Sequence, residues 1–457
     1  MLSNLNIKIP ANNIEERSYI IKIIIEDFLG LSCNLILDAE ETNYVICFDE
    51  KQIIFKDKFF NIYPKDFSYL DNKNLPSKVL FFKNLFLFDE DIPVIFGDDE
   101  LRVENNKIIC GIDIFASSFF MLTRWEEYVN LTRDEHNRFP GSESLAYKNN
   151  FLHRPVVNEY VEMLKNILLY FNNDLKLSTT NYQLFLTHDV DTLCMWKNWK
   201  QVFKVALGDI IKRKNINLSI ERIAKYLLII RKKINDPYDT FDWLMDKSEA
   251  IGIKSRFYFM SGGTSFYDNY YKVNAKNTLD LMQKIRKREH IIGFHPSYNA
   301  YNNFQQFKNE KDILEKTFKQ KILEGREHYL RFEIPTTWQI WEDNGLEIDG
   351  TCGYADKEGF RCGTGDEFSV FNFLKREKLK LKERPLIIME GTLKNYQNLD
   401  IKQSETIYHY YIDISKKYKM KISMLFHNSS FVSTSWKGWD RLYEQIINYS
   451  SNSIPYL

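Results

Sequence analysis

Apolar and polar positions alternate regularly along the second part of the chain. From residue 182 onward, short apolar runs are followed by longer segments that carry apolar residues at helical spacing. The runs are 182–187, 255–260, 291–295, 329–332, 386–389 and 422–427, with 345–348 as a weaker seventh. This alternation predicts a parallel sheet with helices outside it, either open or closed into a barrel.

The first part of the chain mixes shorter strand-like and helical runs. The strand-like runs are 44–48, 51–55, 79–82 and 92–97. The first two predict a β-hairpin, and apolar spacing predicts helices over 112–128 and 155–170. We therefore expect an α/β domain of unknown role at 1–145, a connecting helix and linker at 146–180, and a larger α/β domain at 181–457.

Several apolar runs of the larger domain end in a polar or charged residue. These residues are Asp189, His295, Glu390 and His427. In parallel α/β folds the functional groups gather at the carboxyl ends of the strands. The first run ends in His188, Asp189 and, one residue further, Asp191. Two acids so close repel each other, so metal binding or acid–base chemistry explains their presence better than folding does. The alternative is that they cap the following helix, as Asp often does after a strand.

Charge and composition restrict the function. Lys and Arg number 62, as do Asp and Glu, so the chain is formally neutral and lacks the basic excess of a general nucleic-acid binder. The six Cys form no C-x-x-C pair, which is typical of reduced thiols. Residues 1–10 show no secretion signal, and no apolar run reaches the roughly 20 residues of a membrane span. We expect a cytoplasmic protein.

A long helical insert at about 201–249 separates the first two apolar runs. It carries basic clusters at 212–214 and 231–233 beside the apolar segment 226–230. A basic amphipathic helix can make peripheral contact with an anionic membrane. The favoured interpretation is a solvated helix face whose other side packs on the barrel.

Five motifs follow one another in the larger domain. They are THDVD at 187–191, GFHPSYN at 293–299, HYLRFEIP at 328–335, DGTCGY at 349–354 with GFRCGT at 359–364, and SMLFHN at 423–428. Their order resembles the polysaccharide deacetylases of carbohydrate esterase family 4, with the NodB-homology fold, over about 182–457. More narrowly, the chain resembles deacetylase-like proteins of bacterial surface-polysaccharide gene clusters, which carry a similar N-terminal domain.

The resemblance implies a deformed (β/α) barrel that hydrolyses an N-acetyl, or else an O-acetyl, group on a glycan. In that family a divalent metal polarises the carbonyl and activates a water, a carboxylate accepts the proton, and a histidine protonates the leaving group. Carried over, Asp189 is the general base, Asp191 and His295 are metal ligands, and His427 is the general acid. Arg331 would orient the base, or would only pair with another acid.

One position departs from the family pattern. Where the family has a second His four residues after the first, this chain has Asn299, which is also a common turn residue. We assign Asn299 to the metal site, with His188 as a replacement ligand. Zinc is the expected ion, although an amide oxygen suits harder ions better than zinc.

Substrate contacts are assigned to three residues of the third and fourth motif regions. Tyr354 and Trp338 can stack on sugar faces, although core packing explains such aromatic residues equally well. Arg361 belongs to the same expected set. The substrate would be a glycan, or a lipid-linked or nucleotide-linked sugar precursor.

Two other functions remain open at this point. Asp189-Val190-Asp191 fits the D-x-D pattern of glycosyltransferases, but that function has no task for His295 or His427. Asn299 is the best argument for a decayed deacetylase barrel that binds glycans or acts as a scaffold without catalysis.

Overall fold

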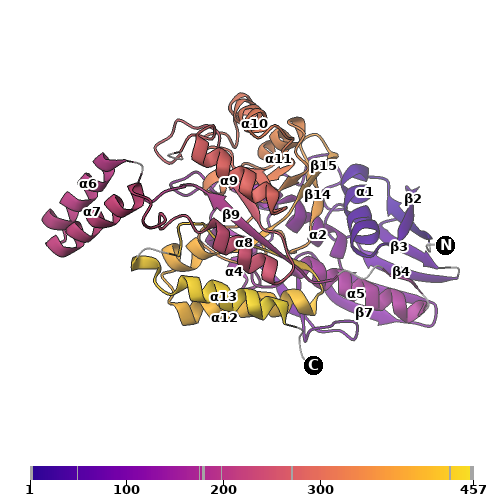
Figure 1. Cartoon of the computed structure of the whole chain (residues 1–457). Helices are drawn as coiled ribbons and strands as arrows, with labels where there is room; N and C mark the ends of the chain where they lie inside the picture. Colours follow the sequence, from indigo (N-terminus) through magenta and orange to yellow (C-terminus); the bar gives the residue numbers. More distant parts are fainter. Residues whose placement is uncertain are drawn as a thin grey trace.

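The chain forms a mixed α/β structure with two main sheets (Figure 1). The computed structural model describes residues 4–48, 50–173, 175–177, 181–196, 198–268, 271–431 and 434–452. The larger sheet has nine strands in the order β14-β15-β13-β12-β11-β10-β9-β17-β16. Only the edge strand β14 runs antiparallel to its neighbour, so the expected parallel α/β class is confirmed.

The nine strands are short, and most of their residues are buried, although β15, next to the edge strand, alternates exposed and buried positions. They are β9 (Gln183–Val190), β10 (Arg256–Phe259), β11 (Ile291–Phe294), β12 (Glu324–Gly325), β13 (Ile348–Asp349), β14 (Phe368–Asn372), β15 (Glu377–Glu383), β16 (Leu386–Met389) and β17 (Lys421–Leu425). In β9 every residue after Gln183 is buried, as expected for a parallel strand covered on both faces. The sheet keeps two edges, so it is a curled, deformed barrel rather than a closed one.

Helices surround this sheet, and two of them stand away from it (Figure 1). They are α6 (Trp199–Ile211), α7 (Ile216–Ile230), α8 (Phe241–Ala250), α9 (Lys276–Lys287), α10 (Phe304–Phe318), α11 (Thr336–Asp343), α12 (Ile401–Lys417) and α13 (Trp439–Ser451). The two that stand away are α6 and α7. Across the described ranges, each helix is too short or too polar to cross a membrane.

The N-terminal part builds a six-stranded sheet in the order β2-β1-β3-β4-β8-β7 and a two-stranded one of β5 and β6. Its strands are β1 (Asn4–Pro10), β2 (Ser32–Asp38), β3 (Asn43–Phe48), β4 (Lys51–Lys56), β5 (Leu80–Phe82), β6 (Ile92–Val94), β7 (Gly97–Val103) and β8 (Lys107–Ile112). Its helices are α1 (Ile14–Lys22), α2 (Ile114–Thr123), α3 (Trp125–Val129), α4 (Leu145–Lys148) and α5 (Val156–Phe171). The predicted hairpin is confirmed as β3 and β4, which pair antiparallel.

Two predicted elements differ from the structure. The helix expected over 112–128 is broken at Arg124, whose φ of 54° is left-handed, into α2 and α3. The strand expected over 329–332 is wrong. The strand lies earlier, at β12, and a short 3-10 turn at His328–Leu330 follows it, with left-handed backbone at Tyr329 and Leu330. An apolar run of four residues does not distinguish a strand from a buried turn.

A buried cluster of charges joins the N-terminal part to the larger sheet. Arg361 donates to Glu127, with 2.9 Å between Nε and Oε1. Arg124 donates to the same carboxylate at 3.0 Å and to the Tyr354 hydroxyl at 2.9 Å. All four side chains are almost completely buried. The two parts therefore share one interior, while the domain boundaries at 145 and 180 remain a prediction, with 174 and 178–180 outside the described residues.

We expect Arg361→Met to lower the free energy of unfolding by about 3–5 kcal/mol, because it removes one of the two guanidinium partners of the buried Glu127 carboxylate. Urea denaturation measures this loss. Arg102→Met is the matched control, because its side chain is 66% exposed and its pair with Glu100 lies at the surface. An equally small loss in both variants would contradict a structural role for Arg361.

Candidate metal and acid–base site

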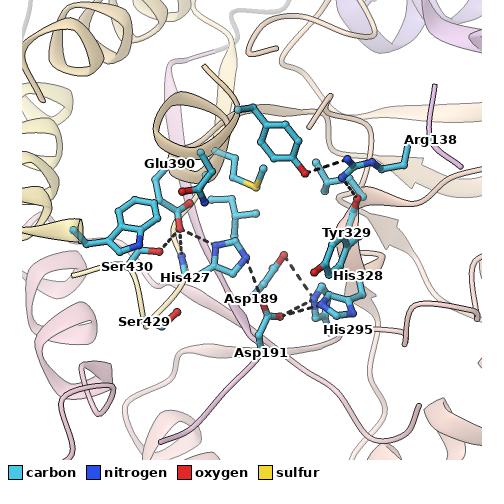
Figure 2. A pocket seen from close by; sticks show the side chains of 17 residues that line it. Arg138, Asp189, Asp191, His295, His328, Tyr329, Glu390, His427, Ser429 and Ser430 are labelled. Atoms are coloured by element: carbon cyan, nitrogen blue, oxygen red, sulfur yellow. Dashed lines mark hydrogen bonds and ion pairs between the residues drawn. The ribbon is translucent and has the colours of Figure 1, made fainter. Parts of the chain in front are cut away.

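Five strands of the larger sheet end in polar side chains that meet in one place (Figure 2). These side chains are Asp189 and Asp191 at the end of β9, His295 after β11, Arg326 and His328 after β12, Glu390 after β16 and His427 after β17. Because these strands are parallel, their carboxyl ends lie at the same end of the sheet. The four strand-end residues that the sequence indicated, Asp189, His295, Glu390 and His427, do lie together in the structure.

Except for Arg326, which lies behind Asp189, the side chains at these strand ends line a cavity of about 320 Å³. Its lining mixes acids, imidazoles, hydroxyls and aromatic rings. The lining residues are Arg138, Asp189, Asp191, His295, His328, Tyr329, Leu330, Met389, Glu390, Gly391, Asn395, Tyr396, Leu425, His427, Ser429, Ser430 and Trp436. A concave site with a few convergent polar groups is the usual form of a small-molecule site.

Three of these residues could hold a metal ion. One donor atom each from Asp191, His295 and His328 lies within 4.8 Å of the other two. Asp191 Oδ1 is 3.4 Å from His295 Nε2 and 3.6 Å from His328 Nε2. Two imidazoles and one carboxylate form a donor set typical of catalytic zinc, which keeps a fourth position open.

The hydrogen bonds around this set leave lone pairs free for a cation. His295 Nδ1 donates to the Arg326 carbonyl at 2.6 Å, which turns the Nε2 lone pair toward Asp191. His295 Nε2 and Asp191 Oδ1 are buried and have no hydrogen-bond partner among the described residues. Burial raises the pKa of Asp191, but the nearby histidines lower it by more than burial raises it. The carboxylate is therefore ionised. The donor set therefore fits a divalent metal.

Asp189 is held on one side only. Its Oδ1 accepts from Arg326 Nη1 at 2.9 Å, whereas its Oδ2 lies 3.9 Å from His295 Nε2 and faces the metal set. Arg326 is fully buried and also donates to Thr187 Oγ1 at 2.8 Å and to the Gly350 carbonyl at 2.7 Å. The carboxylate is thus fixed, with one oxygen available to a reacting group.

His427 is paired with the carboxylate of Glu390. The sequence indicated Glu390 as the polar end of a strand but gave it no role. His427 Nδ1 lies 2.7 Å from Glu390 Oε1, and His427 Nε2 lies 3.6 Å from Asp191 Oδ2. Ser430 and the His427 backbone also donate to Glu390 Oε1. Burial lowers the pKa of His427, but Glu390 and the aspartates raise it more, to about 10.

Arg331 does not reach Asp189, and this prediction is corrected. Its guanidinium donates to the His136 carbonyl at 2.8 Å, to the Tyr301 hydroxyl at 3.1 Å and to Asn299 Oδ1 at 3.1 Å. Arg326, five residues earlier, takes the place beside the acid. The third motif begins at His328, so Arg326 lies outside the motifs and was not indicated by them.

Asn299 and His188 do not join the metal set either. The Asn299 amide oxygen is engaged by Arg331. His188 is fully buried on the other face of β9, since side chains alternate along a strand. Its Nδ1 donates to the Phe426 carbonyl at 2.8 Å, and burial lowers its pKa to about 4. His328 supplies the third donor instead, from the turn after β12.

The three residues assigned to substrate contacts lie in the interior. Trp338 is fully buried and donates to Glu383 Oε2 at 2.9 Å. Tyr354 and Arg361 belong to the buried charge cluster. All three are absent from the cavity lining, where the described aromatic rings are those of Tyr329, Tyr396 and Trp436.

The N-terminal part contributes a residue to the cavity that the sequence did not indicate. Arg138 lines it and donates to the Tyr329 carbonyl at 2.9 Å and to the Tyr396 hydroxyl at 3.0 Å. Asp134 accepts from its Nε at 2.8 Å. The loop around 134–138 therefore holds two aromatic residues of the cavity in place.

A family model and several solved structures resemble parts of this chain. Residues 5–173 match the model described as "Family of unknown function (DUF7033)". No curated protein matches the chain.

Among solved structures, the chain is similar to a protein from Mycobacterium smegmatis that is provisionally assigned as a polysaccharide deacetylase. The sequence identity is 9%, the match covers 60% of this chain and 85% of that one, and the TM-score is 0.38. One from Bordetella bronchiseptica, described as involved in O-antigen biosynthesis, has 13% identity over 60% and 86%, and a TM-score of 0.28. A CE4 family pseudoenzyme from Bacillus anthracis has 9% identity over 59% and 60%, and a TM-score of 0.29.

We expect His328→Ala to remove bound metal as completely as Asp191→Ala does, because two remaining donors hold a divalent ion weakly. Asn299→Ala is the matched control and should keep the parent's metal content, about one ion per chain. Elemental mass spectrometry of the purified proteins measures all four. Loss of metal in Asn299→Ala with retention in His328→Ala would reverse the assignment of the third ligand.

Proposed function

We propose that this chain is a metal-dependent hydrolase that removes an N-acetyl group, or else an O-acetyl group, from a glycan or glycan precursor. One observation carries the proposal. The donor set of Asp191, His295 and His328 lies between a buried carboxylate, Asp189, and a carboxylate-paired imidazole, His427. A bound divalent metal would polarise the acyl carbonyl and lower the pKa of a water.

In this proposal Asp189 is the general base. Arg326 holds its Oδ1 at 2.9 Å, so the carboxylate cannot rotate freely, and its Oδ2 faces the donor set. That oxygen accepts the proton of the attacking water. A base must lie within hydrogen-bond reach of the proton that it removes, and a carboxylate fixed by a buried guanidinium meets this geometric demand.

In this proposal His427 is the general acid. Glu390 accepts the Nδ1 proton, so the Nε2 edge of the ring points into the cavity toward Asp191. A proton on Nε2 can pass to the amine that leaves when the amide bond breaks. The Glu390 carboxylate stabilises the charged imidazole, as a buried acid does for the histidine of hydrolase triads.

The cavity suits a single sugar unit with its acyl group. Its volume of about 320 Å³ is at the lower end of the range for small-molecule sites. Two aromatic residues, Tyr396 and Trp436, and two serines, Ser429 and Ser430, line the cavity. Aromatic faces beside hydroxyl groups match the apolar faces and polar edges of a sugar. With the motif resemblance, this supports a glycan in surface-polysaccharide metabolism as the substrate.

The other two functions lose their supporting observations. Asn299 was the argument for a decayed barrel, and His328 supplies an imidazole in its place. A D-x-D glycosyltransferase uses both acids to hold a metal and a nucleotide sugar. Here one oxygen of Asp189 is committed to Arg326, and two histidines complete the donor set around Asp191.

We expect Asp189→Asn to reduce hydrolysis on the order of 10²–10⁴-fold while metal content is unchanged, because the amide cannot accept the proton of water. Acetate release from a panel of N-acetylated oligosaccharides measures the rate. Asp312→Asn, on the surface of α10, is the control. Full activity of Asp189→Asn would remove this residue from its role as the base.

We expect His427→Ala to lower kcat by a similar factor without loss of metal, because the leaving amine then has no proton donor. Glu390→Gln should lower kcat in the same direction by a smaller factor, with KM little changed, since it acts through the imidazole. Steady-state kinetics on the best substrate of the panel separates kcat from KM. A large rise in KM alone would instead give both residues a role in substrate binding.

A further inference from the structure

Helices α6 and α7 form a hairpin that stands away from the rest of the molecule (Figure 1). The expectation that this insert packs on the barrel is wrong for these two helices. Val202 and Ala206 of α6 are buried, but in α7 only Ser219 is. Asp209 of α6 pairs with Arg222 of α7, with 2.6 Å between Oδ2 and Nε. The helices thus contact each other and leave their other faces uncovered.

The uncovered faces are unusually apolar. Residues 199–234, which we call the hairpin segment, hold eleven of the 32 large apolar side chains that are exposed in the described part of the chain. They are Trp199, Phe203, Leu207, Ile210, Ile211, Ile216, Ile220, Leu227, Leu228, Ile230 and Ile234. In α6 the spacing of four residues from Trp199 through Phe203, Leu207 and Ile211 places them on one stripe. Such a concentration marks an interaction surface.

The same segment is strongly basic. It carries ten Lys or Arg against two acids, and since the whole chain is neutral, all other residues together carry a net charge of −8. Both acids already have basic partners, because Asp209 pairs with Arg222 and Glu221 with Lys225. Lys212, Lys214 and Lys232 are exposed and, among the described residues, have no ion-pair partner.

The chain leaves the hairpin segment close to a strand end of the site. The segment begins shortly after Asp191 and returns to α8 through Tyr238 and Thr240. Asn428, next to His427, donates to the Tyr238 carbonyl at 2.9 Å, and its own carbonyl accepts from Thr240 Oγ1 at 2.9 Å. The base of the hairpin is therefore attached to the strand end that carries the proposed acid.

We propose that the hairpin segment binds the surface of a membrane that contains anionic lipids. Apolar stripes with flanking Lys and Arg match the apolar interior and negative headgroups of such a surface. A dimer in which the hairpin segments of two copies face each other is disfavoured, because it would bring like charges together. If the proposed function holds, this contact presents the cavity to glycans attached to lipids.

Vesicle flotation with the full-length protein tests the proposal. We expect binding to vesicles of phosphatidylcholine with phosphatidylglycerol, weakening as salt is added, and little binding to phosphatidylcholine alone. Replacing Lys212, Lys214 and Lys232 by Gln should weaken binding on the order of 100-fold, at about fivefold for each charge. The control replaces Lys73, Lys402 and Lys419, which are exposed outside the segment.

A second variant tests the apolar stripe. Phe203→Ser, Leu207→Ser and Ile211→Ser together should weaken binding at least about tenfold. Leu85→Ser with Phe88→Ser, two exposed residues far along the chain from the hairpin, should not. Equal urea midpoints would show that each variant is folded.

Three results would overturn the proposal: no flotation of the parent, equal flotation of the hairpin and control variants, or a dimer in solution that the hairpin variants abolish. Asp191→Ala should float like the parent, so failure of the proposed hydrolysis leaves this test intact.

Discussion

The arrangement of the site depends on one buried guanidinium, that of Arg326. Its side chain donates to Asp189 and Thr187 on β9 and to the Gly350 carbonyl after β13. Its backbone N–H donates to the Phe294 carbonyl at 3.0 Å, and its carbonyl accepts from His295. One residue thus fixes the proposed base, a proposed metal ligand and the strands between them. Burying a charge is costly, and several well-placed partners offset that cost here.

The N-terminal part belongs to this arrangement as well. The cluster of Arg124, Glu127 and Arg361 anchors it to the larger sheet, and the loop that follows brings Arg138 to the cavity. Because Arg138 contacts Tyr329 and Tyr396 at once, the N-terminal part shapes the cavity wall. The N-terminal part can therefore determine what fits in the cavity, although its sequence contains no candidate catalytic residue.

The sequence predicted the α/β class and the gathering of strand-end groups, because periodicity and polar endings are local signals. These signals pointed to Asp189, Asp191, His295 and His427, which line the cavity. His328 and Arg326 were missed because their positions depend on tertiary contacts. A left-handed turn at Tyr329 orients His328. The guanidinium of Arg326 reaches Asp189 on β9, which is separated from β12 by two other strands of the sheet. Asn299 and Arg331 were misassigned by motif spacing and contact each other instead. Spacing along a chain does not tell which side chains share one point in space.

The neutrality of the chain conceals a strong separation of charge. With a net charge of +8 on the hairpin segment and −8 elsewhere, an anionic surface attracts one projecting element and repels the remainder. At physiological salt, screening limits this electrostatic effect to a distance of about 8 Å. The membrane surface would therefore orient the protein only when the two are close together. In that orientation, the helices would lie at the headgroups while the body stays outside. The attachment of Asn428 to the base of the hairpin then keeps His427 and the cavity near the surface, where a glycan attached to a lipid begins.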